Sequence, residues 1–271
     1  MKLRSLALVA VSLVALTGFK PDDIKLTRTF AVGNKDVYVQ TYKSKNSIET
    51  PAGNQDFDVT GSSTFSIIYK KTNEKGCEID MVTSDMKMES AMAMPGVADS
   101  MPKEITMSGM LDARNRVSEV KAGKGLDPMV AMMMHSANMG STGFFTEFPE
   151  NAVKIGDTWE FSIGMANAGV PADTKLKAKL ESEKDNYWVV RVTGTIPMKM
   201  DMSQASQQTG GMEMVMNMTM NMDYGVQVEK GTGRALSLTG KIATTMKMEF
   251  PSLGMSMPGT GTTEISAKLK Q

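Results

Sequence analysis

The chain has 271 residues, and its 30 basic and 30 acidic side chains give a formal net charge of zero. Nucleic-acid binding is not favoured, because no basic excess is available to neutralise phosphates. The single cysteine, Cys77, excludes an intramolecular disulfide, so the fold must be held by its core. Methionine occurs 28 times, which is unusual for an ordinary domain.

The N-terminal residues have the pattern of a secretory signal peptide. Lys2 and Arg4 precede an apolar run from Leu6 to Leu16 that is too short to span a membrane. We expect cleavage near Gly18, with a retained N-terminal anchor as the alternative. No cysteine stands near this site, which argues against a lipid anchor. The mature protein is therefore predicted to be exported, to the periplasm or the extracellular space, without a transmembrane span.

Strand signals dominate the rest of the chain, and short turns between them favour antiparallel meanders. The predicted fold class is mainly all-β: a large curved antiparallel sheet or half-barrel, built from two similar halves with one central helix. The expected strands are Val37–Tyr42, Thr64–Lys70, Cys77–Ser84, Ile105–Met110, Val117–Lys121, Thr158–Ile163, Lys175–Glu181, Trp188–Thr195, Met198–Met202, Met212–Met222, Gly225–Glu229, Ala235–Thr239, Ile242–Met248 and Thr262–Lys268.

One helix is expected in the middle of the chain. Asp127 is a good N-cap, Pro128 fits the first helical position and Gly140 fits a C-terminal stop. The phrases Phe30-Ala-Val-Gly33 and Val153-Lys-Ile-Gly156 open the two flanking parts in a similar way, which indicates an internal duplication. The predicted division is a signal peptide (1–18), a first β half (19–125), the helix and linker (126–148) and a second β half (149–271).

Methionines alternate with other residues in several segments. Six of them stand at every second position from Met212 to Met222, and the period of two places them on one face of a strand. Met-Lys-Met followed by Asp or Glu begins at Met86, Met198 and Met246. We predict that these residues line one apolar sheet face. The predicted ligand-binding residues are Met86, Met88, Met198, Met200, Met202, Met212, Met214, Met216, Met218, Met220 and Met222.

Such a face suits a hydrophobic guest, because methionine is unbranched and adapts to variable apolar shapes. The competing interpretation is a core packed against the helix and the other half, although such a core would normally use more Leu, Ile and Val. We predict a non-enzymatic exported protein that binds a lipid-like or other hydrophobic molecule, or a partner, without a cofactor. A purely structural envelope protein is an alternative, and the oligomeric state is left open.

A second alternative is a Cu(I)- or Ag(I)-binding envelope protein, because thioethers are soft ligands. Met132, His135 and Met139 fall on one face of the expected helix, although the same spacing describes an ordinary buried stripe. His135 is the only histidine, and no Gly-x-Ser-x-Gly elbow is present. A serine triad therefore finds no support, and no catalytic residues are predicted.

The segment Phe148-Pro-Glu-Asn-Ala-Val-Lys-Ile-Gly-Asp-Thr-Trp-Glu160 resembles a phrase of exported bacterial β proteins that are grouped only as domains of unknown function. The resemblance implies a signal peptide, an all-β body of about this length and no assigned activity. In layout the chain more distantly resembles periplasmic lipoprotein carriers, whose curved antiparallel half-barrel shelters acyl chains under a helical lid. Within the segment, Gly156 and Asp157 are expected to form a turn, and Trp159 to point inward from a new strand.

Overall fold

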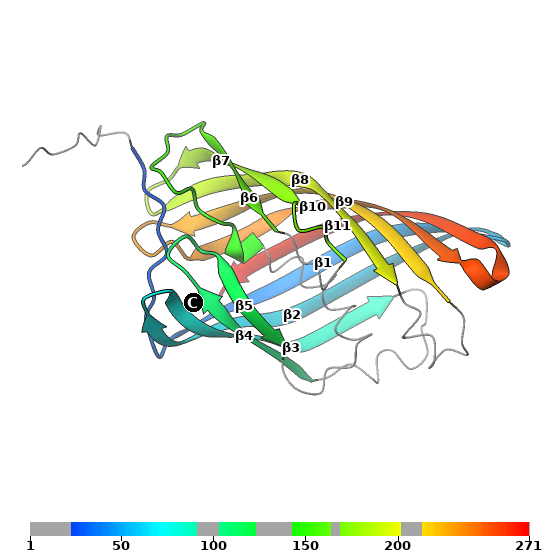
Figure 1. Ribbon diagram of the computed structural model, residues 1–271, viewed down its shortest axis with the longest axis horizontal. Helices are drawn as coiled ribbons and strands as arrows, with labels where there is room; N and C mark the ends of the chain where they lie inside the picture. Colours follow the sequence, from blue (N-terminus) through cyan, green and yellow to red (C-terminus); the bar gives the residue numbers. More distant parts are fainter. Residues whose placement is uncertain (1–22, 91–102, 123–142, 164–168, 202–212, 271) are drawn as a thin grey trace, which may run out of the picture.

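The computed structural model describes residues 23–90, 103–122, 143–163, 169–201 and 213–270. These residues form one eleven-stranded antiparallel sheet that curves around one face (Figure 1). The predicted fold class is thus confirmed. The strands are β1 (Lys35–Thr50), β2 (Gly53–Asn73), β3 (Gly76–Ser90), β4 (Glu104–Leu111), β5 (Val117–Ala122), β6 (Thr158–Ser162), β7 (Lys175–Glu183), β8 (Tyr187–Asp201), β9 (Val215–Glu229), β10 (Ala235–Phe250) and β11 (Met255–Leu269).

Two meanders make up the sheet and meet in its middle. The first runs from β1 outward to β5, and the second starts at the opposite edge with β6 and runs inward to β11. The junction is the antiparallel pair of β1 and β11, which extends from Tyr38↔Leu269 to Ile48↔Gly259. Both parts of the chain therefore belong to one continuous sheet, which is open between the edge strands β5 and β6.

Several strands are longer than the sequence predicts. Residues 188–195 and 198–201, which belong to two separate strands in the sequence prediction, lie in one strand, β8, which runs through Pro197. The backbone N–H of Lys199 points away from β9 and donates to the carbonyl of Gly169 at 3.0 Å. The nitrogen of Pro197 faces the same side as the N–H of Lys199, away from β9. At this level β7 no longer pairs with β8, because their last residue pair is Lys177↔Thr193. The proline therefore removes no hydrogen bond of the β8–β9 ladder.

Alternating side chains build the core on the inner face of the sheet, which is the face that the sheet curves around. In β7 the apolar residues Leu176, Ala178 and Leu180 are fully buried, while the residues between them are exposed. Cys77 of β3 is a buried free cysteine, as expected, and burial raises the pKa of its thiol. The core thus follows the period of two that the sequence displays.

The core is concentrated at one end of the sheet, which we call the closed end. There the 3-10 turn η1 (Gly143–Phe145) lies against the inner face, and the ring of Phe144 stacks on that of Phe65 with centroids 5.5 Å apart. The other end, which we call the open end, carries the β1–β2 turn and the β10–β11 turn with its 3-10 turn η4 (Pro251–Leu253). Figure 1 shows these two hairpins reaching farther than the outer strands.

Two irregular segments, residues 23–34 and 143–155, tie the closed end together through backbone hydrogen bonds to turns of both meanders. Because each segment joins strands that are remote in the sheet, these bonds hold its curvature at this end. Ile24 N donates to Val153 O (2.8 Å) between the two segments. Arg28 N to Ala113 O (2.8 Å) and Phe148 N to Arg114 O (2.7 Å) reach the β4–β5 turn of the first meander, and Thr29 N to Thr232 O (2.9 Å) reaches the β9–β10 turn of the second.

Some sequence predictions lie outside the described residues. These are the signal peptide at 1–18 and the helix at 127–140. The described part of the chain contains the two 3-10 turns and no α-helix, so the central helix of the predicted fold is not seen there. Among the described residues no helix is long and apolar enough to cross a membrane. The proposed duplication stays a prediction.

Asn115 provides a test of how the closed end is held. Its side-chain amide is buried and donates to the carbonyls of Phe144 (2.8 Å) and Thr146 (3.1 Å), and its φ of 60° is left-handed. Replacing Asn115 by glycine keeps that conformation but removes both bonds. We expect a loss of about 1–3 kcal/mol of unfolding free energy in urea titrations. The same change at exposed Asn186 should stay within about 0.5 kcal/mol, and equal losses at the two sites would contradict this role.

Candidate functional site

A cavity of about 370 Å³ lies on the inner face of the sheet, and it shares Leu238 and Ala267 with the closed-end core. Its wall is mainly apolar on the side formed by β9 and β10. There, methionine side chains, of which all but Met220 are only half-buried, replace the fully buried Val, Leu and Ile of the core. The apolar lining residues are Val59, Met88, Met216, Met218, Met220, Leu238, Ile242, Met246, Ile265 and Ala267.

The side of the cavity formed by β1 is polar. Gln40, Tyr42, Ser44 and Asn46 follow one another on the inner face of this strand. The hydroxyl of Ser44 lies 3.0 Å from that of Thr263, and Ser63 donates to Oε1 of Gln40 at 3.2 Å. Nε2 of Gln40 is buried, with no hydrogen-bond partner in the described part of the chain. A buried donor of this kind would be satisfied by an acceptor oxygen in the cavity.

A glycine on β2 shapes the same wall. A Cβ atom added to Gly61 would lie 2.2 Å from Cζ of Tyr42, so the tyrosine ring lies across the neighbouring strand at this glycine. Tyr42 is half-buried and lines the cavity, and burial raises the pKa of its phenol. Any larger residue at Gly61 would push the ring away from its place in the wall.

The strand register places Met216, Met218, Met220 and Met222 on the inner face of β9, two residues apart. Met214 is half-buried and precedes the strand. Met198 and Met200 lie on the inner face of β8, opposite Met218 and Met216. The predicted lining residues Met202 and Met212 lie outside the described residues. The role of the whole set in ligand binding stays a prediction.

A β-bulge brings the methionines of β3 to the inner face. Thr64 of β2 pairs with Ser84, but Ser62 pairs with Lys87, so β3 has one extra residue at this point. Asp85 takes a positive φ of 52° there. Inward residues are odd-numbered up to Thr83 and even-numbered from Met86. Met88 consequently lines the cavity, whereas Met86 is half-buried beside it in the strand.

Methionines of different strands stand directly opposite one another toward the open end. Two rows cross the sheet, the outer one nearer the turn of η4. The inner row consists of Met198, Met218 and Met246, and the outer row consists of Met200, Met216, Met248 and Met257. Sequence positions that are far apart thus become lateral neighbours, and this arrangement is not visible from the alternation within any one strand.

The residue type changes along the same strands at about the same level. Toward the closed end, the inner face of β8 presents Val190, Val192 and Ile196, and that of β9 presents Val226 and Val228, all almost fully buried. Toward the open end both strands present methionine instead. Branched residues are favoured in strands and have stiff side chains, whereas methionine side chains are flexible. The inner face is therefore rigid and packed toward the closed end and pliable toward the open end.

The metal site that the sequence offers as an alternative, Met132 with His135 and Met139, lies outside the described residues. Within the described part of the chain no group of three or more His, Cys, Asp or Glu residues is placed to hold a metal ion. Gly156 and Asp157 form a turn, as expected, in which Oδ2 of Asp157 accepts the N–H of Lys154 at 2.8 Å.

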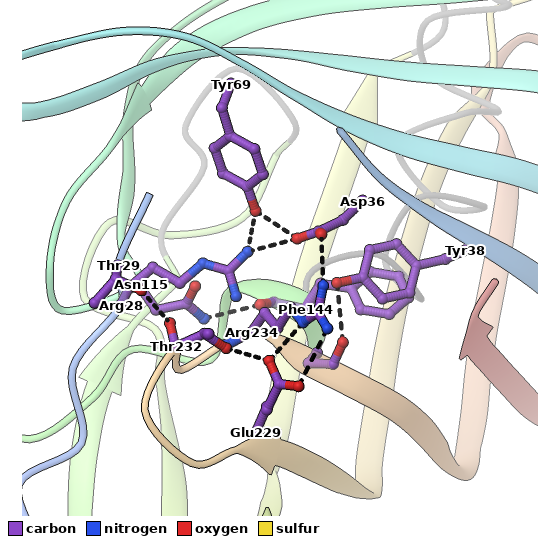
Figure 2. Close-up of polar contacts among 11 residues, drawn as sticks. Arg28, Thr29, Asp36, Tyr38, Tyr69, Asn115, Phe144, Glu229, Thr232 and Arg234 are labelled. Carbon is purple, nitrogen blue, oxygen red and sulfur yellow. Dashed lines mark hydrogen bonds and ion pairs between the residues drawn. The ribbon is translucent and has the colours of Figure 1, made fainter. Parts of the chain in front are cut away.

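A polar cluster that includes Arg28, Asp36 and Tyr69 lies at the closed end of the sheet (Figure 2). Nη2 of Arg28 donates to Oδ2 of Asp36 at 2.9 Å, and the side chains are only 3% and 8% exposed. The hydroxyl of Tyr69 donates to the same carboxylate oxygen at 2.5 Å. Burial raises the pKa of Tyr69, so its phenol stays a neutral donor. The cluster fixes residues 23–34 to β1 and β2.

Arg234 extends this cluster to the second meander. Its Nη1 lies 3.5 Å from Oδ1 of Asp36, and its Nε donates to Glu229 at 2.6 Å. Burial acts to raise the pKa of Glu229, but hydrogen bonds from Arg234 and Thr232 outweigh it and hold the pKa below 4.5. Sequence analysis missed the cluster, because its members are isolated charges in ordinary turn and strand segments that only the fold brings together.

Comparisons with known proteins agree with the resemblance seen in the sequence. Residues 136–235 match a family of unknown function (DUF6263), and this part includes the segment Phe148–Glu160. The likeness to a family of unknown function is therefore confirmed over that part of the chain. No curated protein matches the sequence.

Three solved structures show distant similarity. One, from work on lipid–protein interactions in lipovitellin, has a TM-score of 0.49 and 11% identity over 90% of this chain and 26% of that chain. The COG4313 outer membrane channel from Pseudomonas putida F1 has a TM-score of 0.26 and 6% identity over 90% and 97%. A DUF1329 family protein from Desulfovibrio piger ATCC 29098 has a TM-score of 0.14 and 9% identity over 87% and 85%. This chain spans about a quarter of the lipovitellin chain. These similarities carry no conclusion about function.

Replacing Asp36 by asparagine tests the buried ion pair. The change leaves the guanidinium of Arg28 buried without its counter-charge, so we expect a loss of about 3–5 kcal/mol in urea unfolding. The double replacement Asp36→Leu with Arg28→Met should recover most of it, because neither charge then remains. Asp173→Asn, at an exposed site, is the control. A loss in the double variant as large as in Asp36→Asn would show that the charge is not the cause.

We predict that the contribution of Glu229 to the stability of the fold depends on pH. Its folded-state pKa lies below the ordinary value of 4.5, so the ionised carboxylate stabilises the fold above pH 4.5, and this contribution is lost as the pH falls through the lower folded value. Thermal unfolding followed by circular dichroism should show the wild type more stable than Glu229→Gln at neutral pH. The difference should shrink in acid. A difference that is the same at every pH would contradict the assignment.

Proposed function

We propose that this protein binds a hydrophobic, lipid-like molecule in the cavity on the inner face of the sheet, and that it acts by binding rather than by catalysis. The observation that supports this most directly is the cavity itself. Its methionine wall continues the core of the closed end into a level where the apolar side chains are no longer closely packed. Unfilled concave apolar surface with a few polar groups is typical of small-molecule sites.

The lining fits a guest of variable shape. Met216, Met218 and Met246 are half-buried and border the cavity. Unbranched thioether side chains can change rotamer around different apolar groups at little cost, whereas the Val and Ile residues of the closed end are stiff. The volume of about 370 Å³ falls within the usual range for ligand pockets. A flexible hydrocarbon chain is the kind of molecule that such a wall accommodates.

The polar wall supports an amphiphile over a pure hydrocarbon. Gln40 Nε2 is a buried donor without a partner among the described residues, and it lies beside the apolar Leu238 and Ala267 in the lining. A carbonyl or carboxylate oxygen of the guest would satisfy this donor, and leaving it unpaired has an unfavourable free energy. The proposed guest is therefore a molecule with an apolar chain and an acceptor oxygen, such as a fatty acid or an ester lipid.

The proposal includes export of the protein, with residues 1–18 as a signal peptide. This location rests on the sequence pattern alone. An exported binding protein of this kind would meet lipids outside the cytoplasm, and its sheet would shelter their apolar part from water.

Thr244 allows the cavity to be filled without touching the core. It lies in the lining on β10, while the next residue, Thr245, is exposed on the other face. Replacing Thr244 by phenylalanine should reduce the binding of a fluorescent fatty acid by about tenfold or more, because the ring occupies the guest's space. Thr245→Phe should bind as the wild type does. Fluorescence titration measures both affinities, and native mass spectrometry of the purified wild type should show a co-purifying lipid.

The proposal would be overturned by a wild-type protein that carries no lipid and takes up no fluorescent fatty acid. Equal affinities of the two phenylalanine variants would also overturn it, since binding would then not depend on the cavity. Thermal unfolding of both variants separates a local effect from loss of the fold.

A further inference from the structure

The outer row of methionines is largely unused by the proposed function. Met216 is its only member in the cavity lining, and Met200 is its only member packed against the closed-end core. All four side chains are half-buried. The pairs Met200↔Met216, Met216↔Met248 and Met248↔Met257 place one thioether on each of four consecutive strands, β8 to β11. Lipid binding in the cavity therefore does not explain why four consecutive strands carry a thioether at this level.

Packing alone does not call for sulfur at these positions. Strands favour Val, Ile and aromatic residues, and the inner faces of β8 and β9 carry such residues toward the closed end, for example Val190 and Val226. Four neighbouring positions that are all methionine supply something that branched hydrocarbons lack. That property is a soft, neutral electron-pair donor at the end of a flexible side chain.

The geometry of the row lets several sulfur atoms reach one point. Directly opposite residues of antiparallel strands have their Cβ atoms about 4.5–5.5 Å apart, and each methionine has three rotatable bonds beyond its Cα. Met216 stands between Met200 on one side and Met248 on the other. Their thioethers can therefore converge over Met216 without any movement of the backbone.

The chemistry of the row selects the ion. Lys199, Lys247 and Glu249 alternate with the methionines and lie on the opposite face, where Lys247 and Glu249 pair with each other at 2.6 Å. The row itself therefore offers thioethers without carboxylates, which suits soft monovalent ions and not Ca²⁺, Mg²⁺ or Zn²⁺. We propose that the outer row binds one Cu(I) or Ag(I) ion, with Met216 as the central ligand and Met200 and Met248 on either side.

Leucine variants test this directly, because leucine keeps the apolar volume and removes the ligand. Purified protein is titrated, with ascorbate present, into the coloured Cu(I) complex of bicinchoninate. We expect the wild type to withdraw one equivalent of Cu(I). The triple variant Met200→Leu, Met216→Leu, Met248→Leu should bind about tenfold more weakly or worse. The matched control Met81→Leu, Met107→Leu, Met110→Leu removes three methionines elsewhere in the sheet and should bind as the wild type does.

A second readout identifies the ligands. With ¹³C-methyl-labelled methionine, Ag(I) should shift the methyl signals that the triple variant lacks and leave the signal of Met81 in place. The inference is overturned if the wild type withdraws no Cu(I) or if the control variant weakens binding equally. It is also overturned if His135→Ala abolishes binding while the triple variant keeps it, since the ion would then lie at Met132, His135 and Met139.

The experiments can contradict the proposed metal binding and the proposed lipid binding independently of each other. Met200 and Met248 do not line the cavity, so uptake of the fluorescent fatty acid should be unchanged in the double variant Met200→Leu, Met248→Leu. A protein that takes up the fatty acid but no Cu(I) overturns only the metal site. A protein that withdraws Cu(I) but takes up no fatty acid overturns only the proposed lipid binding.

Discussion

The pairing of β1 with β11 is the constraint on which the rest of the structure depends. Each meander alone would leave a long central edge strand with its backbone groups unpaired, and such edges are unfavourable in isolated sheets. Their union creates one curved inner face. It also places the polar wall of Gln40, Ser44 and Asn46 across β11 from β10 and β9, which carry the methionines. The cavity therefore exists only when both meanders have formed and joined.

The same strands serve two different purposes along their length. At the closed end, stiff branched and aromatic side chains pack tightly, and the buried charges of Arg28 and Asp36 lock the crossing segment onto the sheet. Toward the open end, the strands continue without that filling and present flexible thioethers. The rigid level supplies the stability that lets the pliable level remain incompletely packed.

Much of this fold can be predicted from the sequence, because period-two alternation reports the strand and its inward face directly. The predicted face of Met216 to Met222 and the buried position of Cys77 follow from this rule. The lengths of β8, β9 and β10 do not, since Pro197 and the glycines near the strand centres are normally signs of strand ends. Whether a proline breaks a ladder depends on which way its nitrogen faces, and that depends on the neighbouring strands.

The candidate site is less accessible to sequence reasoning for a related reason. Met200, Met216, Met248 and Met257 are scattered along the chain, and this dispersion argues against a metal site until the register makes them neighbours. The cluster of Arg28, Asp36 and Arg234 is hidden in the same way. Local pattern reveals what one strand presents, whereas a site formed across strands requires the order in which they pair.

The bulge of β3 also determines where this strand can change in length. Asp85 and Met86 both stand opposite Ser63, so the loss of one residue there would leave the later pairs, from Lys87↔Ser62 to Ser90↔Val59, as they are. Loss of a residue from the regular part of the strand would instead turn one stretch of side chains to the opposite face. During evolution, β3 can therefore lose a residue at this one position without a change in how it pairs with β2. The position lies immediately before the methionines that face inward.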